Sequence, residues 1–175
     1  MFKKIAAAAT VTAALFVATQ AHAGNTSDTL KINGTVASVC TVSVEDLNQS
    51  LNLVSGANKT VVGKITETCN AASGYTIRIA SANAGKLVNA ANGNAKVDYT
   101  VDYDSRQNAQ LNSELVQNYG NTQAYGTVKD LKVSVTGNAN RVAGAYADTI
   151  TVTIAANWGR SPDKRSREPP SRCRT

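Results

Sequence analysis

Hydrophobic and polar residues alternate along most of the chain with a period of two, which is the spacing of a half-buried β-strand. The runs with this pattern are 30–36, 61–69, 75–80, 97–104, 131–135 and 146–154. The last run is the clearest, because small or polar residues separate its apolar positions, Tyr146, Ile150, Val152 and Ile154. Six or more such runs predict an all-β chain.

Turn signals separate the runs, since glycine and asparagine tolerate a positive φ. They are Ser73-Gly74, Asn92-Gly93 and Gly137-Asn138. The only helix that we expect covers about 109–118. Short strands joined by such turns predict an antiparallel β-sandwich of the immunoglobulin-like class.

The first 23 residues have the pattern of a signal peptide. Lys3 and Lys4 precede an apolar run over 5–18, and Ala21-His22-Ala23 forms a small-x-small cleavage site. The apolar run is shorter than the roughly 20 residues of a membrane-spanning helix. We therefore expect export, a mature chain that begins at Gly24, and no transmembrane segment after cleavage. The only histidine, His22, would be lost with the signal.

The last 18 residues differ in composition from the rest. Residues 158–175 contain all three prolines, the only tryptophan and the third cysteine, Cys173. This break predicts a folded domain over 24–157, followed by a basic, disordered tail. A frameshift, read-through or vector-derived end would explain such a tail, and so would a genuine basic appendage.

The formal net charge of +6 lies outside this predicted domain. The signal contributes +2 and the tail +4, whereas residues 24–157 hold ten basic and ten acidic side chains. A neutral domain argues against a nucleic-acid partner, which would select a basic surface.

Cys40 lies near the end of the first strand pattern and Cys69 at the end of a later one, and both would enter an oxidising compartment. We predict a disulfide between them, which closes a loop of about 30 residues and stabilises the fold by roughly 3 to 4 kcal/mol. A metal site is the alternative, but it lacks a second cysteine pair or a histidine. We therefore expect no metal and no cofactor.

We find no catalytic constellation, and no imidazole survives signal cleavage. Three acidic residues, Asp98, Asp102 and Asp104, would suit a glycosidase or a calcium site. On a strand, however, these even positions share one face opposite the apolar residues between them. We expect a solvated polar face there, and no enzyme.

Three segments together resemble a bacterial chaperone–usher pilus subunit of the spore coat protein U branch. They are LKINGTVASVCTVSV, ITETCNAASGYTIRIASANAGKLVN and AGAYADTITVTIAAN, and the likeness covers about 30–157. The resemblance implies an immunoglobulin-like sandwich that lacks its last strand. A strand from a partner would take the place of the missing strand. The first partner would be a periplasmic chaperone, and the second, at an outer-membrane usher, would be the N-terminal segment of the next subunit.

The resemblance makes two segments of this chain candidate contacts. Leu30, Ile32, Gly34 and Val36 share one face, as a donated strand would, although they could equally form the domain's own first strand. Tyr146, Ile150, Val152 and Ile154 form the candidate final strand, which would contact the chaperone or the next subunit. The tail departs from the family, whose subunits end near this strand.

The leading function is therefore a structural subunit of a fimbrium or coat, exported to the periplasm and then to the cell surface, where it would serve adhesion and biofilm formation. The alternative is a periplasmic or tip β-sandwich that binds a glycan as an adhesin. Adhesins usually add a separate lectin domain, and the chain has no length for one.

Overall fold

The computed structural model describes residues 27–158, which fall into two units, 27–35 and 36–158. Strands are the only regular elements of these residues, and no helix occurs among them. In sequence order the strands are β1 (Cys40–Asp46), β2 (Ala57–Cys69), β3 (Gly74–Ser81), β4 (Lys86–Asn89), β5 (Lys96–Asp98), β6 (Thr100–Tyr103), β7 (Arg106–Ala109), β8 (Leu115–Gly120), β9 (Ala124–Val135), β10 (Tyr146–Ala147) and β11 (Ile150–Ala156). The predicted signal peptide, and the tail from residue 159 on, lie outside the described residues.

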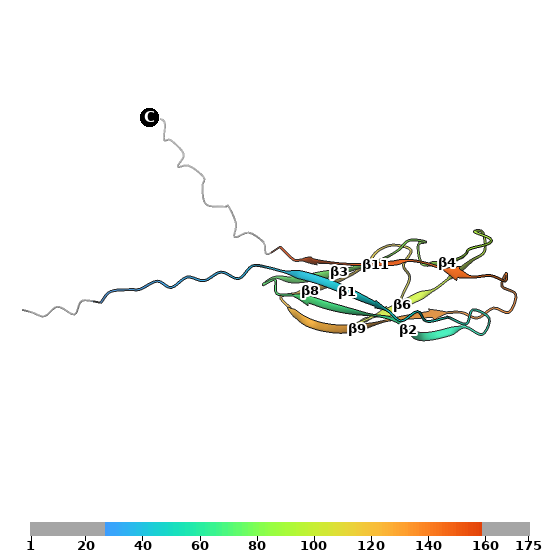
Figure 1. The fold of residues 1–175 in the computed structure, drawn as a ribbon, viewed down its shortest axis with the longest axis horizontal. Coiled ribbons are helices and arrows are strands. Elements are labelled where there is room, and N and C mark those ends of the chain that lie inside the picture. Colours follow the sequence, from blue (N-terminus) through green and yellow to red (C-terminus); the bar gives the residue numbers. More distant parts are fainter. Residues whose placement is uncertain (1–26, 159–175) are drawn as a thin grey trace, which may run out of the picture. The chain divides into compact units, whose positions relative to one another are not determined.

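All strand pairs are antiparallel, and they form three sheets (Figure 1). The largest has the order β1-β2-β9-β6-β7, and the second has the order β11-β3-β8. A small third sheet, β10-β4-β5, continues the fold at one end. The predicted antiparallel all-β fold class is confirmed.

The two larger sheets pack face to face through the apolar side of each strand. Ile65 of β2 and Val101 of β6 meet Ile77 and Ile79 of β3 in one core cluster, and all four are fully buried. The alternation read from the sequence therefore identifies the inward positions correctly in the central strands. Burial of these side chains supplies most of the driving force for this packing.

One tight turn carries the chain from the first sheet to the second. β2 ends at Cys69 and β3 begins at Gly74, whose φ is +78°. A Cβ at Gly74 would lie 1.9 Å from the carbonyl oxygen of Tyr119, so only glycine fits. The predicted turn at Ser73-Gly74 is confirmed, and it places the start of β3 at the same end of the sandwich as Cys69.

The structure differs from the sequence prediction at two elements. No helix forms over 109–118: Leu111 enters the core, and the residues from Leu115 form β8, which pairs with β3. The strand expected over 30–36 is also absent from the described structure, in which the first strand begins at Cys40. In the first case tertiary packing overrides a local helical preference.

The expected solvated face at Asp98, Asp102 and Asp104 is only partly correct. Asp98 is exposed, but Asp102 is buried, accepts a hydrogen bond from Asn108 N (2.7 Å) and pairs with Lys59 Nζ (3.1 Å). The Asn108 hydrogen bond, followed by the Lys59 charge, holds the pKa of Asp102 below its usual range. These carboxylates are thus used separately, in structural contacts.

Candidate functional site

Two strand edges are left unpaired on one side of the sandwich. β1 is the outer strand of the first sheet and β11 is the outer strand of the second. They contact each other and lie side by side in Figure 1, yet the described residues form no hydrogen bond between them. This open side therefore presents backbone N–H and C=O groups of two strands to any added strand.

The inward side chains of both edge strands are incompletely covered. Ile150, Val152 and Ile154 of β11 are half-buried, and Val44 of β1 is 53% exposed. The residues opposite them on the neighbouring strands are fully buried. Ile154 lies opposite Ile77, Val44 lies opposite Ile65, and Ile77 and Ile65 are each 0% exposed. We call this strip of incompletely covered apolar side chains along the edges of β1 and β11 the groove.

The groove widens into a hollow of about 920 Å³, where β1 ends and β11 begins. Asp46 and Ile150 mark these two strand ends in its lining. The apolar side chains around it come from the first sheet, the small third sheet and the loop after β1: Val62, Val133, Leu87, Tyr146, Leu51 and Leu53. This lining suits aliphatic side chains of a partner.

Asp148 holds one wall of the hollow. Its carboxylate accepts hydrogen bonds from Ser81 Oγ (2.5 Å), Tyr99 OH (2.6 Å) and Asn83 N (3.1 Å). Burial, together with the hydrogen bond to Asp148, raises the pKa of Tyr99, so the phenol stays protonated as a donor. Ser81 ends β3 and Tyr99 lies between β5 and β6, so Asp148 ties the start of β11 to both layers.

This anchor also corrects the predicted final strand. Tyr146 belongs to β10 and pairs with Asn89 of β4, whereas Ile150, Val152 and Ile154 belong to β11 and pair with β3. The chain changes sheets at Asp148. Period-two alternation alone did not reveal this break, but the aspartate within the run was a signal for it.

Gly144 is required beside a buried asparagine in the same wall. Asn89 is 1% exposed, donates to Ala143 O (3.2 Å) and accepts from the amides of Ala91 and Asn92 (2.9 and 3.0 Å). A Cβ at Gly144, where φ is +143°, would lie 2.6 Å from Asn89 Nδ2. The Gly-x-Tyr-x-Asp sequence at 144–148 is therefore explained by the architecture of this wall.

Arg141 also lines the hollow. Its Nε donates to Leu53 O (3.1 Å) and its Nη2 to Thr136 O (2.8 Å), so the loop after β1 is tied to the segment after β9. Neither Arg141 nor Asn89 was singled out from the sequence. Side-chain bonds to distant backbone carbonyls leave no periodic signal.

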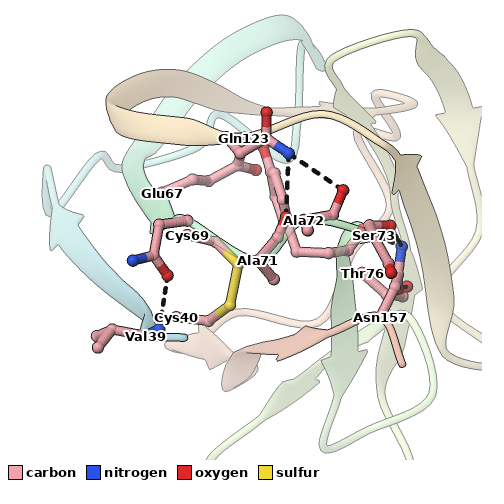
Figure 2. The surroundings of a disulfide bond; sticks show 12 residues. Val39, Cys40, Glu67, Cys69, Ala71, Ala72, Ser73, Thr76, Gln123 and Asn157 are labelled. Atoms are coloured by element: carbon pink, nitrogen blue, oxygen red, sulfur yellow. Dashed lines mark hydrogen bonds between the residues drawn. A yellow bond between two sulfur atoms is a disulfide. The ribbon is translucent and has the colours of Figure 1, made fainter. Parts of the chain in front are cut away.

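The predicted disulfide between Cys40 and Cys69 is present in the structure (Figure 2). The two cysteines lie directly opposite each other in the β1–β2 pair. The bond therefore fixes the register of β1 at the end of the groove away from the hollow.

The candidate donor residues lie in a segment that the structure assigns to no strand. Residues 27–39 have no regular structure, and Leu30, Ile32 and Val36 are 89%, 88% and 85% exposed. Gly34 lies among them and is exposed too. Three aliphatic side chains at alternate positions are thus left without a core to enter.

A buried polar cluster elsewhere in the sandwich escaped the sequence analysis. Glu67 is fully buried and accepts hydrogen bonds from Tyr75 OH (2.6 Å) and Tyr103 OH, and it pairs with Lys129 Nζ (2.9 Å). Burial raises the pKa of both tyrosines, and the hydrogen bonds to Glu67 raise it further. The cluster joins β3 to the first sheet, which gives it a structural role.

The described residues contain no group of three or more histidine, cysteine or acidic side chains arranged to hold a metal ion. Between residues 27 and 158 there is also no helix long and apolar enough to cross a membrane.

The Spore Coat Protein U domain family matches residues 26–153. No curated protein matches the chain in sequence. Among solved structures, the minor tip subunit HdaB of the E. coli Hda pilus is 10% identical, with a TM-score of 0.40 over 79% of this chain and 97% of that one. The Salmonella SafD adhesin is 13% identical, with a TM-score of 0.40 over 69% of this chain and 90% of that one.

Proposed function

The chain belongs to the Spore Coat Protein U domain family, and we propose that it is a fibre subunit whose open sandwich is completed by a strand from its neighbour. The resemblance drawn from the sequence makes this family a branch of the chaperone–usher pilus subunits, which would make the chain a structural protein and not an enzyme. The family match includes the exposed segment 30–36 as well as the sandwich up to residue 153, within β11. Acceptor and donor would thus be parts of one family domain.

The observation that carries this proposal is the pairing of an unfilled apolar groove with an unburied apolar strand in the same chain. β1 and β11 offer unpaired backbone groups and half-buried aliphatic side chains. The segment 30–36 offers a backbone without partners in any described sheet and three exposed aliphatic side chains. Addition of the segment as a strand would pair the backbone groups of both parts, which supplies affinity. Its alternate side chains would fill the groove, which supplies specificity.

The topology favours one direction for the donated strand. The end of the groove at Cys40 is where each subunit's own N-terminal segment leaves its sandwich, since β1 begins there. In a head-to-tail fibre, the neighbour that donates its strand must therefore lie beyond the hollow. The donated strand would run toward the hollow, antiparallel to β11, with Val36 nearest to it.

The energy of such an exchange is comparable to the stability of a domain. Burial of an aliphatic side chain contributes about 1.5 to 3 kcal/mol, so Leu30, Ile32 and Val36 together would supply roughly 5 to 9 kcal/mol. A domain of this size has a total stability of about 5 to 15 kcal/mol. An empty groove should thus leave the subunit marginal and prone to aggregate, which explains the need for a periplasmic chaperone.

The same proposal covers export and biological role. Residues 1–23 would act as the signal peptide, and 24–157 would form the mature pilin domain. A periplasmic chaperone would hold β11 until an outer-membrane usher exchanges it for the next subunit. The resulting fimbrium would serve adhesion and biofilm formation at the cell surface, and the tail over 158–175 would be dispensable.

The oligomeric state of the full-length protein tests the proposal. Purified without a chaperone, it should form concentration-dependent oligomers that resist denaturant. Ile32→Asp should abolish them, because it would bury a charge in the groove, whereas Lys31→Asp, at a neighbouring outward position, should not. A full-length monomer that is stable at high concentration would refute strand donation.

A further inference from the structure

The side chain of Asn70 binds the backbone of the residues that precede β1. Asn70 Nδ2 donates to Ala37 O (3.0 Å), and Val39 N donates to Asn70 Oδ1 (2.7 Å). The backbone adds a third bond, from Asn70 N to Val39 O (3.1 Å). We call these three contacts the Asn70 latch. Figure 2 shows the bond to Val39 next to the disulfide.

The latch continues the pairing of β1 where its partner strand stops. β2 ends at Cys69, opposite Cys40, so residues 37–39 have no strand beside them. A carboxamide carries one acceptor and one donor group, as a peptide unit does, and here it substitutes for the missing strand. Ala37 and Val39 are themselves exposed and contribute little to the core. The latch therefore fixes the direction of the chain without sealing the sandwich.

We infer that Asn70 sets the stiffness of the joint between consecutive subunits of the fibre. This inference rests on the proposed function. If residues 30–36 lie in a neighbour's groove, residues 37–39 are the whole covalent link between two sandwiches. A free link of three residues would rotate about several soft backbone dihedrals, whereas the latch holds its two ends. Asn70 is thus a positioning residue, which acts on the link and not on the groove.

Three properties separate this role from an ordinary contribution to folding. The latch lies at the Cys40 end, and none of its residues lines the hollow. The disulfide beside it already fixes the β1 register. The latched residues are exposed. Loss of the Asn70 side chain should therefore loosen the joint while subunit stability and groove occupancy stay almost unchanged.

The test compares fibres of the full-length protein with those of Asn70→Ala by electron microscopy. We expect the variant to assemble into oligomers of unchanged denaturant resistance whose persistence length is at least about twofold shorter. Asn70→Asp, which keeps the acceptor for Val39 N but loses the donor to Ala37 O, should give an intermediate value. Hydrogen exchange at the Val39 amide should accelerate in the same order.

Gln123→Ala is the matched control. Gln123 also donates its side-chain amide to backbone near the disulfide, at Ala71 O (3.0 Å) and Ala72 O (3.4 Å), but it forms no hydrogen bond with residues 37–39 (Figure 2). Its loss should leave the persistence length unchanged. Equal stiffness of Asn70→Ala and wild-type fibres, or equal softening by Gln123→Ala, would overturn the inference alone. Absence of oligomers from the wild-type protein would overturn the proposed function and the joint with it.

Discussion

The two long sides of the sandwich are closed in different ways. On the side of β7 and β8, polar side chains bridge the sheets: Tyr119 OH donates to Asp104 (2.7 Å), Lys129 Nζ lies over the Tyr119 ring (3.7 Å), and Arg106 Nε donates to Gln117 (3.1 Å). On the side of β1 and β11, the described residues form no such bridge, and half-buried aliphatic residues face solvent.

This difference indicates where each side obtains its stability. The bridged side contains its own partners, since every buried polar side chain in the described structure is satisfied. Both sides end in unpaired strand edges, but the open side adds incompletely covered apolar side chains, which only added chain can cover. On the proposed function, one side is complete within the subunit and the other would be completed by assembly.

Removal of the donor segment should have the largest effect. A chain that begins at Ala37 should lose most of its stability, and a peptide of residues 28–37 should restore it and raise the melting temperature. The reason is the roughly 5 to 9 kcal/mol expected from three buried aliphatic side chains. A peptide with Ile32→Asp should fail and one with Lys31→Asp should succeed. Equal rescue by both peptides would contradict groove filling.

A substitution on the bridged side should lower the free energy of unfolding by the same amount whether or not the donor strand is bound. Lys129→Ala leaves the buried Glu67 carboxylate without its cation, which should cost about 3 to 5 kcal/mol. Denaturant unfolding of the peptide-complemented protein would measure this loss. The difference in unfolding free energy between the variant and the parent chain should stay the same as the peptide concentration is raised. Lys96→Ala, at an exposed lysine, is the control. Full recovery by peptide would mean that the two sides are coupled.

Loss of the disulfide should have a smaller effect. Replacing Cys40 and Cys69 by serine should cost roughly 3 to 4 kcal/mol by the loop-entropy account. Because Cys40 starts β1, amide exchange should rise more in β1 than in β8. Cys173→Ser should change neither quantity. Free thiols at both positions in periplasmic protein would contradict the bond itself.

Alkaline pH should have the smallest effect on stability, through the buried tyrosines that bind Glu67. Tyr75 and Tyr103 have pKa values raised above the ordinary 10.0, so their contribution is complete below pH 10 and is lost as the pH rises further. At half a unit above pH 10 the loss should be about 1 kcal/mol per tyrosine. Unfolding free energies between pH 8 and 10.5 would measure it. An unfolding free energy that rises over this range would contradict the role of Tyr75 and Tyr103 as protonated hydrogen-bond donors.

Local alternation was sufficient to predict the central strands, because residues such as Ile77 and Ile79 face one core on every second position. The disulfide also followed from the strand positions of its cysteines. The helix expected over 109–118 failed because Leu111 and β8 are placed by contacts with distant strands. Helix propensity does not register such contacts.

The groove was predictable only in outline. The apolar faces of 30–36 and 150–154 are visible in the sequence, but the sheet change at Asp148 depends on Ser81 and Tyr99, which lie far away along the chain. Glu67 and Asn70 likewise appear as ordinary polar residues until the fold brings their partners near. Side-chain contacts of long sequence separation are the part that pattern analysis does not reach.

Amide hydrogen exchange on the complex of the chain beginning at Ala37 with the 28–37 peptide tests the central claim most directly. An added strand must occupy the free edge of β11, so every second amide of β11, the set that points away from β3, should be as protected as β3 itself. The outer amides of β7 and β8 should exchange freely in the same sample. If the outward amides of β11 exchange as fast as those of β7 and β8, the donated strand is not there.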